Sequence, residues 1–359
     1  MTQEEFTARY MPQFSEQQKA AVMETEGPVL LLAVPGSGKT TVLVTRLGYM
    51  ALCCGIDPAR ILAVTYTVAA TRELRARFTA RFPDLAGRTP EFRTINGLSA
   101  KIIEACGRQR GPAFELLENA GELASLVGRI YQELNGEYPT DSTIREVRTA
   151  ITYCKNMMLS TDEIAAQDFS LPHFAELYAR YCAALREARQ MDYDDQMAYA
   201  LAILRKRPEI LAEFQEHYPY LCVDESQDTS RVQHAIIELL AQKTGNLFMV
   251  GDEDQSIYGF RAAYPEALLR FSAVWPRRRC CWRTITAPRR KFCGWQACLL
   301  RETGSAIPRP SAQQGRRAAG CILRTQPRGR RSTGICWRWL GSRARRFPFC
   351  TATTIVPFR

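Results

Sequence analysis

Short apolar runs alternate with helix-like stretches in the first part of the chain. Val29 to Val34 and Ile61 to Thr65 are apolar runs of strand length, and Thr40 to Leu52, between them, has helical spacing. This alternation is typical of β-α-β units, in which a parallel sheet carries helices on its faces. It predicts an α/β domain that continues to about residue 110.

The pattern becomes helical between residues 111 and 189, where Leu, Ile, Tyr and Ala are spread among charged residues without a convincing strand. The alternation then returns with two apolar runs that end in acidic residues, Tyr220 to Val223 and Leu247 to Val250. We therefore expect residues 1–110 and 190–276 to share one parallel sheet, interrupted by an inserted α-helical domain at residues 111–189.

Residues 277–359 have a different composition from the rest. They carry 19 Arg, one Lys and one Glu, so the remainder of the chain has a net charge of −8 although the total is +11. No hydrophobic period of 2 or 3.6 runs through this tail, which predicts a disordered or poorly folded segment. A nucleic-acid-binding arm is the alternative interpretation of so many arginines. The overall charge is therefore poor evidence for a basic surface on the folded part.

The length of 359 residues is enough for two or three domains. No leader-like N-terminus and no apolar run of about 18 residues is found, so we expect a cytoplasmic protein without a membrane partner. The cysteines form no CxxC pair, which argues against a zinc site.

A phosphate-binding motif follows the first apolar run. Residues 33–40 read AVPGSGKT and depart from the pattern GxxxxGK(S/T) only at Ala33. Glycines allow the backbone to turn its N–H groups toward phosphate oxygens, Lys39 suits the β- and γ-phosphates, and the Thr40 hydroxyl suits Mg²⁺. The pattern predicts a site for ATP and Mg²⁺ formed by this loop: Gly36, Ser37, Gly38, Lys39 and Thr40.

Paired carboxylates follow the strand-like run that ends at Val223. A strand end is where a parallel sheet presents its binding loops, and Asp224 and Glu225 suit two tasks there, binding Mg²⁺ and activating the attacking water. With the P-loop, the VDESQD segment (223–228) and the VGDEDQSIYGFR segment (250–261), the chain resembles the UvrD/Rep family of superfamily 1 helicases over about residues 10–276.

This resemblance implies a RecA-like motor domain and ATP-driven 3′-to-5′ unwinding of DNA. It implies catalytic roles for Lys39, Glu225 and Gln255, and adenine binding by Gln18 in the segment FSEQQ. The DYDD segment at residues 192–195 resembles a family segment that we interpret as structural. A P-loop kinase or other small-substrate phosphotransferase is a less favoured alternative because of the QSIYGFR segment.

The resemblance also implies DNA contacts, with single-stranded or tailed duplex DNA as the partner and the oligomeric state left open. Two segments depart from the family pattern: TYTVAA (65–70) where relatives read TFTNKAA, and TINGL (94–98) where they read TFHSL. The lost lysine is expected to weaken phosphate binding. The implied DNA-contact residues are Thr65, Tyr66, Thr94, Tyr258, Phe260 and Arg261.

The codons offer an explanation for the tail. If the last base of each codon is joined to the first two bases of the next, residues 279–296 allow the translation LLLEDNYRSTPEILRLA, which resembles the next motif of the family. We hypothesise a frameshift between Pro276 and Arg279. A chain translated in this way lacks the second motor domain, so we expect weak Mg-ATP binding and no strand separation. The rival hypothesis is a non-enzymatic nucleic-acid-binding protein that uses the basic tail.

Overall fold

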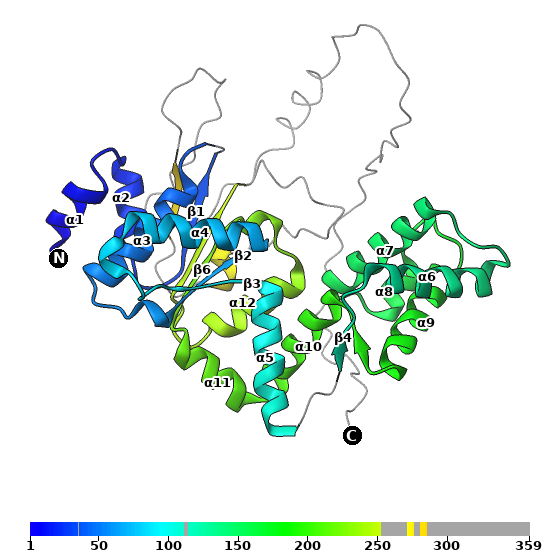
Figure 1. The fold of residues 1–359 in the computed structure, drawn as a ribbon. Helices are drawn as coiled ribbons and strands as arrows, with labels where there is room; N and C mark the ends of the chain where they lie inside the picture. Colours follow the sequence, from blue (N-terminus) through cyan, green and yellow to red (C-terminus); the bar gives the residue numbers. More distant parts are fainter. Residues whose placement is uncertain (35, 111–113, 253–270, 276–280, 286–359) are drawn as a thin grey trace, which may run out of the picture. The chain divides into compact units, whose positions relative to one another are not determined.

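A parallel sheet forms the centre of the fold (Figure 1). The computed structural model describes residues 1–34, 36–110, 114–252, 271–275 and 281–285. In these residues, six strands pair in the order β3-β2-β6-β7-β1-β8, and every pairing is parallel. The predicted α/β class with a parallel sheet is confirmed. The strands are β1 (Val29–Ala33), β2 (Ile61–Thr65), β3 (Glu91–Thr94), β6 (Tyr220–Val223), β7 (Leu247–Gly251) and β8 (Cys281–Ile285).

Helices cover both faces of the sheet, because successive residues of a strand point to opposite faces. Leu31 packs into one apolar core and its neighbour Leu30 into another. This double burial explains why the strands are continuous apolar runs. The first core includes residues of α1 (Gln3–Tyr10), α2 (Glu16–Met23), α3 (Lys39–Leu52) and α4 (Val68–Arg81). The second includes residues of α5 (Ile95–Arg110), α10 (Tyr193–Lys206), α11 (Pro208–His217), α12 (Arg231–Ala241) and α14 (Phe271–Val274).

Four helices between α5 and α10 pack around a third core. They are α6 (Ala120–Asn135), α7 (Asp141–Asn156), α8 (Thr161–Ala166) and α9 (Phe174–Glu187). Their core contains Val127, Ile151 and Leu177 and shares no buried residue with the two cores of the sheet. The helical character expected from the spacing is therefore present. The division into an inserted domain with boundaries at 111 and 189 stays a prediction.

The chain enters and leaves this helical segment at adjacent positions. The short strand β4 (Glu115–Leu116) pairs in parallel with β5 (Gln190–Met191). No strand was expected within residues 111–189, so β4 corrects that part of the prediction. A two-residue strand has too little hydrophobic pattern to be recognised in a sequence.

Two strands of the main sheet also differ from the expectation. β3 was not predicted, because its sequence EFRT is short and polar. The strand β8 pairs with β1 within the stretch expected to be disordered. Its sequence CWRTI contains aromatic and β-branched residues, which favour strands, and pairing satisfies the backbone groups along the edge of β1. The prediction of disorder was therefore wrong for residues 281–285. Residues 286–359 lie outside the described part of the chain.

A buried ionic cluster joins α7 to the start of α10. Lys155 Nζ lies 2.7 Å from both Asp192 Oδ2 and Asp195 Oδ1, and the Tyr181 hydroxyl donates to Asp192. Asp192 also caps α10, where it accepts a hydrogen bond from the Asp195 backbone N–H. The DYDD segment therefore has a structural role in capping and in joining two elements. No helix in the described residues is long and apolar enough to cross a membrane.

Candidate nucleotide-binding site

The candidate residues lie where the parallel strands end. The register places Leu32 of β1 opposite Gly251 of β7, and Val223 of β6 opposite Met249 of β7, so these adjacent strands end at nearly the same level. The loops that follow them carry the P-loop, Asp224 and Asp252. In open parallel sheets, ligands bind in the crevice outside these carboxyl ends.

The P-loop has the backbone geometry that phosphate binding needs. Gly36 and Gly38 have φ values of 72° and 85°, in the left-handed region that residues with a Cβ rarely adopt. Gly38 caps the 14-residue helix α3 without a side-chain hydrogen bond to the first turn. The buried Ser37 Oγ has no hydrogen-bond partner among the described residues. A helix N-terminus with such turns is suited to an anion.

Lys39 is held at this strand edge by two contacts. Its Nζ donates to the Ala33 carbonyl at 3.1 Å and lies 3.3 Å from Asp252 Oδ2, and both side chains are buried. Thr40 follows in the first turn of α3 and is half-buried. Sequence reasoning did not select Asp252 as a site residue, although its position directly after an apolar run was the available signal.

Asp224 and Glu225 come directly after β6, the strand beside β7. The Asp224 N–H donates to the Val64 carbonyl of β2 at 3.0 Å, which holds this residue against the sheet. The pKa of Asp224 is raised to about 7. Burial is the larger cause, and the nearby negative charge of Glu225 adds to it. Glu225 has a φ of 49°, so the chain turns sharply at this point into the short 3-10 helix η3 (Ser226–Asp228).

Gln227 connects the carboxylate loop to the end of β7. Its Nε2 donates to Glu225 Oε2 at 2.6 Å, and its Oε1 accepts from the Asp252 N–H at 3.0 Å. Close packing requires Gly251 here, because a Cβ at this position would lie 2.6 Å from Ser226 Oγ. Gln227 was recognised only as part of a motif, and its bridging contacts depend on a residue 25 positions away.

Gln18 lies against the P-loop. Its Nε2 donates to the Ser37 carbonyl at 3.1 Å, while its Oε1 accepts from the Ser15 N–H in the capping box of α2. The structure therefore brings Gln18 into contact with the P-loop, as its sequence position suggested. Adenine binding by its amide stays a prediction.

The family model for the UvrD/REP helicase N-terminal domain matches residues 14–276. The chain belongs to this family. The resemblance inferred from the P-loop and the two acidic segments is confirmed.

Curated relatives carry the names of ATP-dependent DNA helicases. PcrA of Leuconostoc citreum is 35% identical over 269 residues, which cover 73% of this chain and 35% of PcrA. Putative helicase YjcD of Bacillus subtilis is 32% identical over 262 residues (72% and 34% of the two chains). Rep of Buchnera aphidicola is 31% identical over 268 residues (72% and 40%). The chain thus spans between about a third and two-fifths of the length of these relatives.

Two of the residues that the UvrD/REP resemblance assigned to DNA have hydroxyls engaged within the protein. Thr65 Oγ1 is buried and donates to the Thr67 carbonyl at 3.0 Å. Thr94 Oγ1 accepts from the Gly97 N–H at 3.0 Å in the first turn of α5. Tyr66, between β2 and α4, is half-buried and lines a cavity. Their roles in DNA binding stay predictions, and Tyr66 is the best placed of the three.

Four predicted residues of the UvrD/REP segment 250–261 lie outside the described residues. They are Gln255, Tyr258, Phe260 and Arg261. The segment is described only up to Asp252, at the edge that carries Lys39 and Asp224.

Proposed function

We propose that the edge formed by β1, β6 and β7 binds Mg-ATP. The observation that carries this proposal is the convergence of three strand ends on one loop with left-handed glycines, beside Lys39 and Asp224. In this proposal, the backbone of residues 36–38 and Lys39 bind the phosphates, and Gln18 binds adenine. Mg²⁺ needs few protein ligands when phosphates complete its shell, so Thr40 and Asp224 are sufficient.

We further propose that Glu225 activates the water that attacks the terminal phosphate. The Gln227 amide supports this role by fixing one Glu225 oxygen, which leaves the other carboxylate oxygen to accept a proton. Gln255 is the proposed sensor of the terminal phosphate, on the basis of the family resemblance alone.

The larger function that we propose is that of the first motor domain of a 3′-to-5′ ATP-dependent DNA helicase. Residues 1–110 and 190–276 form the proposed RecA-like domain, with residues 111–189 inserted. Phosphoryl transfer in such motors needs further cations from a second domain to stabilise the transition state. If residues 277–359 are out of frame, the chain as translated binds Mg-ATP weakly, hydrolyses it slowly and does not separate strands.

Binding of a fluorescent ATP analogue in the presence of Mg²⁺ tests the nucleotide site. Removing the Lys39 amine in Lys39→Ala is expected to weaken binding by about tenfold or more, because a charge-assisted contact to phosphate contributes roughly 1.5–3 kcal/mol. The matched control is Lys243→Ala, which removes an exposed lysine paired with Glu216. Equal affinity of Lys39→Ala and the wild-type chain would contradict the proposal.

Two further measurements test the finer parts. Unwinding of a duplex with a 3′ single-stranded tail is expected to be absent, and robust ATP-dependent unwinding would refute the truncated state. Sequencing the gene across the codon for Pro276 tests the frameshift.

The second candidate function is nucleic-acid binding by residues 277–359, and the net charge of +19 of this tail favours it. It predicts that nucleic-acid binding weakens strongly with salt and that Lys39→Ala does not change the affinity for nucleic acid.

A further inference from the structure

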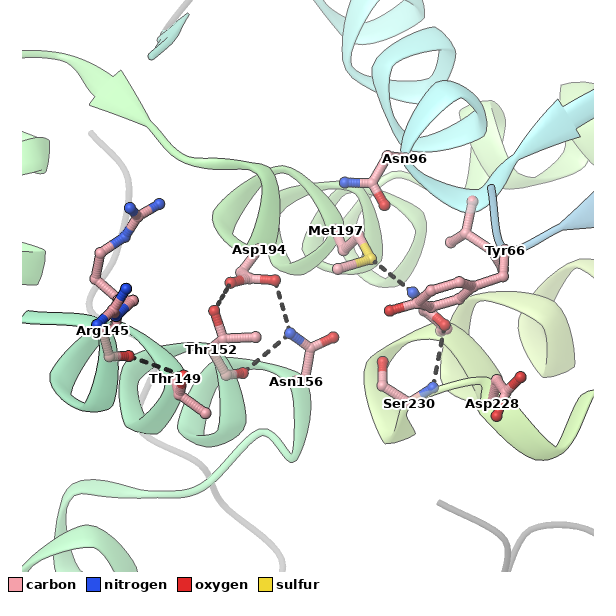
Figure 2. A pocket seen from close by; sticks show the side chains of 13 residues that line it. Tyr66, Asn96, Arg145, Thr149, Thr152, Asn156, Asp194, Met197, Asp228 and Ser230 are labelled. Carbon is pink, nitrogen blue, oxygen red and sulfur yellow. Dashed lines mark hydrogen bonds between the residues drawn. The ribbon is translucent and has the colours of Figure 1, made fainter. Parts of the chain in front are cut away.

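An open cavity of about 590 Å³, lined mostly by polar residue types, lies between helix α7, the loop that follows β2, and the starts of α5 and α12. Figure 2 shows its lining, with Arg145 at one end and Tyr66 at the other. Asn96, at the start of α5, and Ser230, which caps α12, lie on the side of Tyr66. The cavity therefore has a cationic end and an aromatic end.

One face of α7 forms the cationic end. Each residue of α7 that lines the cavity has another lining residue three or four positions away, which places them on one side of the helix. They are Arg145, Arg148, Thr149, Thr152 and Asn156. The other side of the helix packs Ile144, Val147 and Ile151 into the helical core. This burial fixes the rotation of α7, so the arginines are held toward the cavity.

These two arginines have no carboxylate partner in the part of the chain that the structure describes. Among the described residues, neither guanidinium forms an ion pair, whereas Arg77 pairs with Glu73 and Arg180 with Glu176. Arg145 is exposed, and the Arg148 guanidinium makes one long hydrogen bond within the described part of the chain, of 3.5 Å to the Ala120 carbonyl. Both charges are thus accessible to an anion from the solvent.

One of the two carboxylates in the cavity, Asp228, favours one orientation of a bound strand. The other, Asp194, lies beside α7, where both of its oxygens accept hydrogen bonds, from Thr152 Oγ1 at 2.8 Å and from Asn156 Nδ2 at 2.7 Å. Asp228 lies near Tyr66, away from Arg145 (Figure 2). A phosphate is therefore attracted to the α7 end, while the end near Tyr66 suits a base, which carries no charge.

The arginines of α7 complement the Tyr66 loop, which has no cation. The TYTVAA segment that contains Tyr66 includes no Lys or Arg. We propose that Arg145 and Arg148 bind backbone phosphates of single-stranded DNA whose base stacks on Tyr66, so that α7 supplies the cations that the Tyr66 loop lacks. This inference rests on the proposed DNA-binding function and adds the arginines to it.

Photocrosslinking of the full chain to an oligothymidylate containing 5-iodouracil tests this site. The crosslink at Tyr66 is quantified by mass spectrometry, with crosslinks in residues 277–359 as an internal reference. In the double variant Arg145→Gln/Arg148→Gln, occupancy at Tyr66 is expected to fall about tenfold at 0.15 M salt, because two phosphate contacts and their counterion release are lost. The salt dependence of that occupancy should fall by about 1.4 in logarithmic slope.

The matched control is Arg129→Gln/Arg186→Gln, which removes two exposed arginines of the helical segment that do not line this cavity. It should leave the Tyr66 crosslink within about twofold of the wild-type yield, since contacts beyond a Debye length of about 8 Å are screened. An unchanged Tyr66 crosslink in the Arg145/Arg148 variant, or an equal loss in both variants, overturns the inference. A wild-type chain that crosslinks only through residues 277–359 overturns DNA binding at this face as well, while the Mg-ATP proposal is judged separately by analogue binding.

Discussion

Two buried lysines show how similar burial serves different purposes. Lys39 and Lys155 are 8% and 7% exposed, so burial does not distinguish them. Lys155 is surrounded by two carboxylates at 2.7 Å, and although burial opposes its charge, Asp192 and Asp195 raise its pKa above the usual range. Among the described residues, Lys39 pairs with one carboxylate, at 3.3 Å, and its Nζ also donates to the Ala33 carbonyl at 3.1 Å.

The difference indicates which lysine can exchange its partner. A saturated pair holds elements together, as Lys155 does between α7 and α10. Lys39, with one carbonyl contact and one longer carboxylate contact beside the P-loop, can transfer its donors to a ligand at smaller cost. The number and distance of the partners, together with the adjacent backbone, therefore separate a structural lysine from a candidate ligand-binding one.

The largest expected effect is on the saturated cluster. Lys155→Met leaves two buried carboxylates without their cation and is expected to lower the free energy of unfolding by about 3–5 kcal/mol. Lys39→Met should cost less than half as much, because it removes one longer ion pair and one carbonyl contact, whereas Lys155→Met removes two short ion pairs. Urea unfolding followed by circular dichroism measures both. Equal losses in the two variants would contradict the comparison.

A smaller effect is expected from filling the space between Gly251, at the end of β7, and Ser226, in the loop after β6. Gly251→Ala places a Cβ 2.6 Å from Ser226 Oγ, and such overpacking costs about 1–3 kcal/mol. It should also disturb Gln227 and weaken binding of the ATP analogue. Gly55→Ala is a control at a left-handed glycine with open space, where affinity should be unchanged. Retained affinity in Gly251→Ala would show that this contact is not needed for the site.

Acid should weaken Mg²⁺-dependent nucleotide binding. The pKa of Asp224 is raised to about 7, so the carboxylate is increasingly protonated below pH 7 and no longer binds the cation. We expect Mg²⁺-dependent affinity to fall by up to about tenfold per pH unit from 7 to 5, and Asp224→Asn to abolish this dependence. Titrations of Mg²⁺ at fixed analogue concentration measure it. A flat profile for the wild-type chain would contradict the role of Asp224.

The same shift has a consequence for stability. Because the folded state holds the Asp224 proton more tightly than the unfolded state, this group favours folding most below about pH 4. Its contribution is lost as the pH rises from about 4 to about 7. The free energy of unfolding of Asp224→Asn should therefore lack this component when it is measured over the same range.

The smallest effect is expected from a single hydrogen bond of the structural cluster. Tyr181→Phe removes the hydroxyl that donates to Asp192 but leaves both contacts of Lys155. We expect a loss of about 1 kcal/mol in the free energy of unfolding, in line with an ordinary hydrogen bond. Nucleotide affinity should stay the same. A loss as large as that of Lys155→Met would mean that the hydroxyl, and not the ion pair, stabilises the cluster.

The sequence by itself determined the features that depend on neighbouring residues. The apolar runs at 61–65 and 220–223 coincide with β2 and β6, because double burial in a parallel sheet requires continuous apolar residues. The P-loop was equally recognisable, since Gly36, Gly38 and Lys39 are near neighbours in the sequence. The short polar strand β3 and the strand β8 were missed, because their pairing with neighbours, and not their own pattern, makes them strands.

Only the tertiary structure decided which distant side chains meet. Lys39 and Asp252 are 213 residues apart, and the Gln227 bridge and the shared cavity of Tyr66 and Arg145 likewise join separate loops. A local pattern records which face of a helix or strand is buried. It does not record which strand ends and helices become neighbours, because that depends on the order of strands in the sheet and on the packing of α7 against α10 and α12.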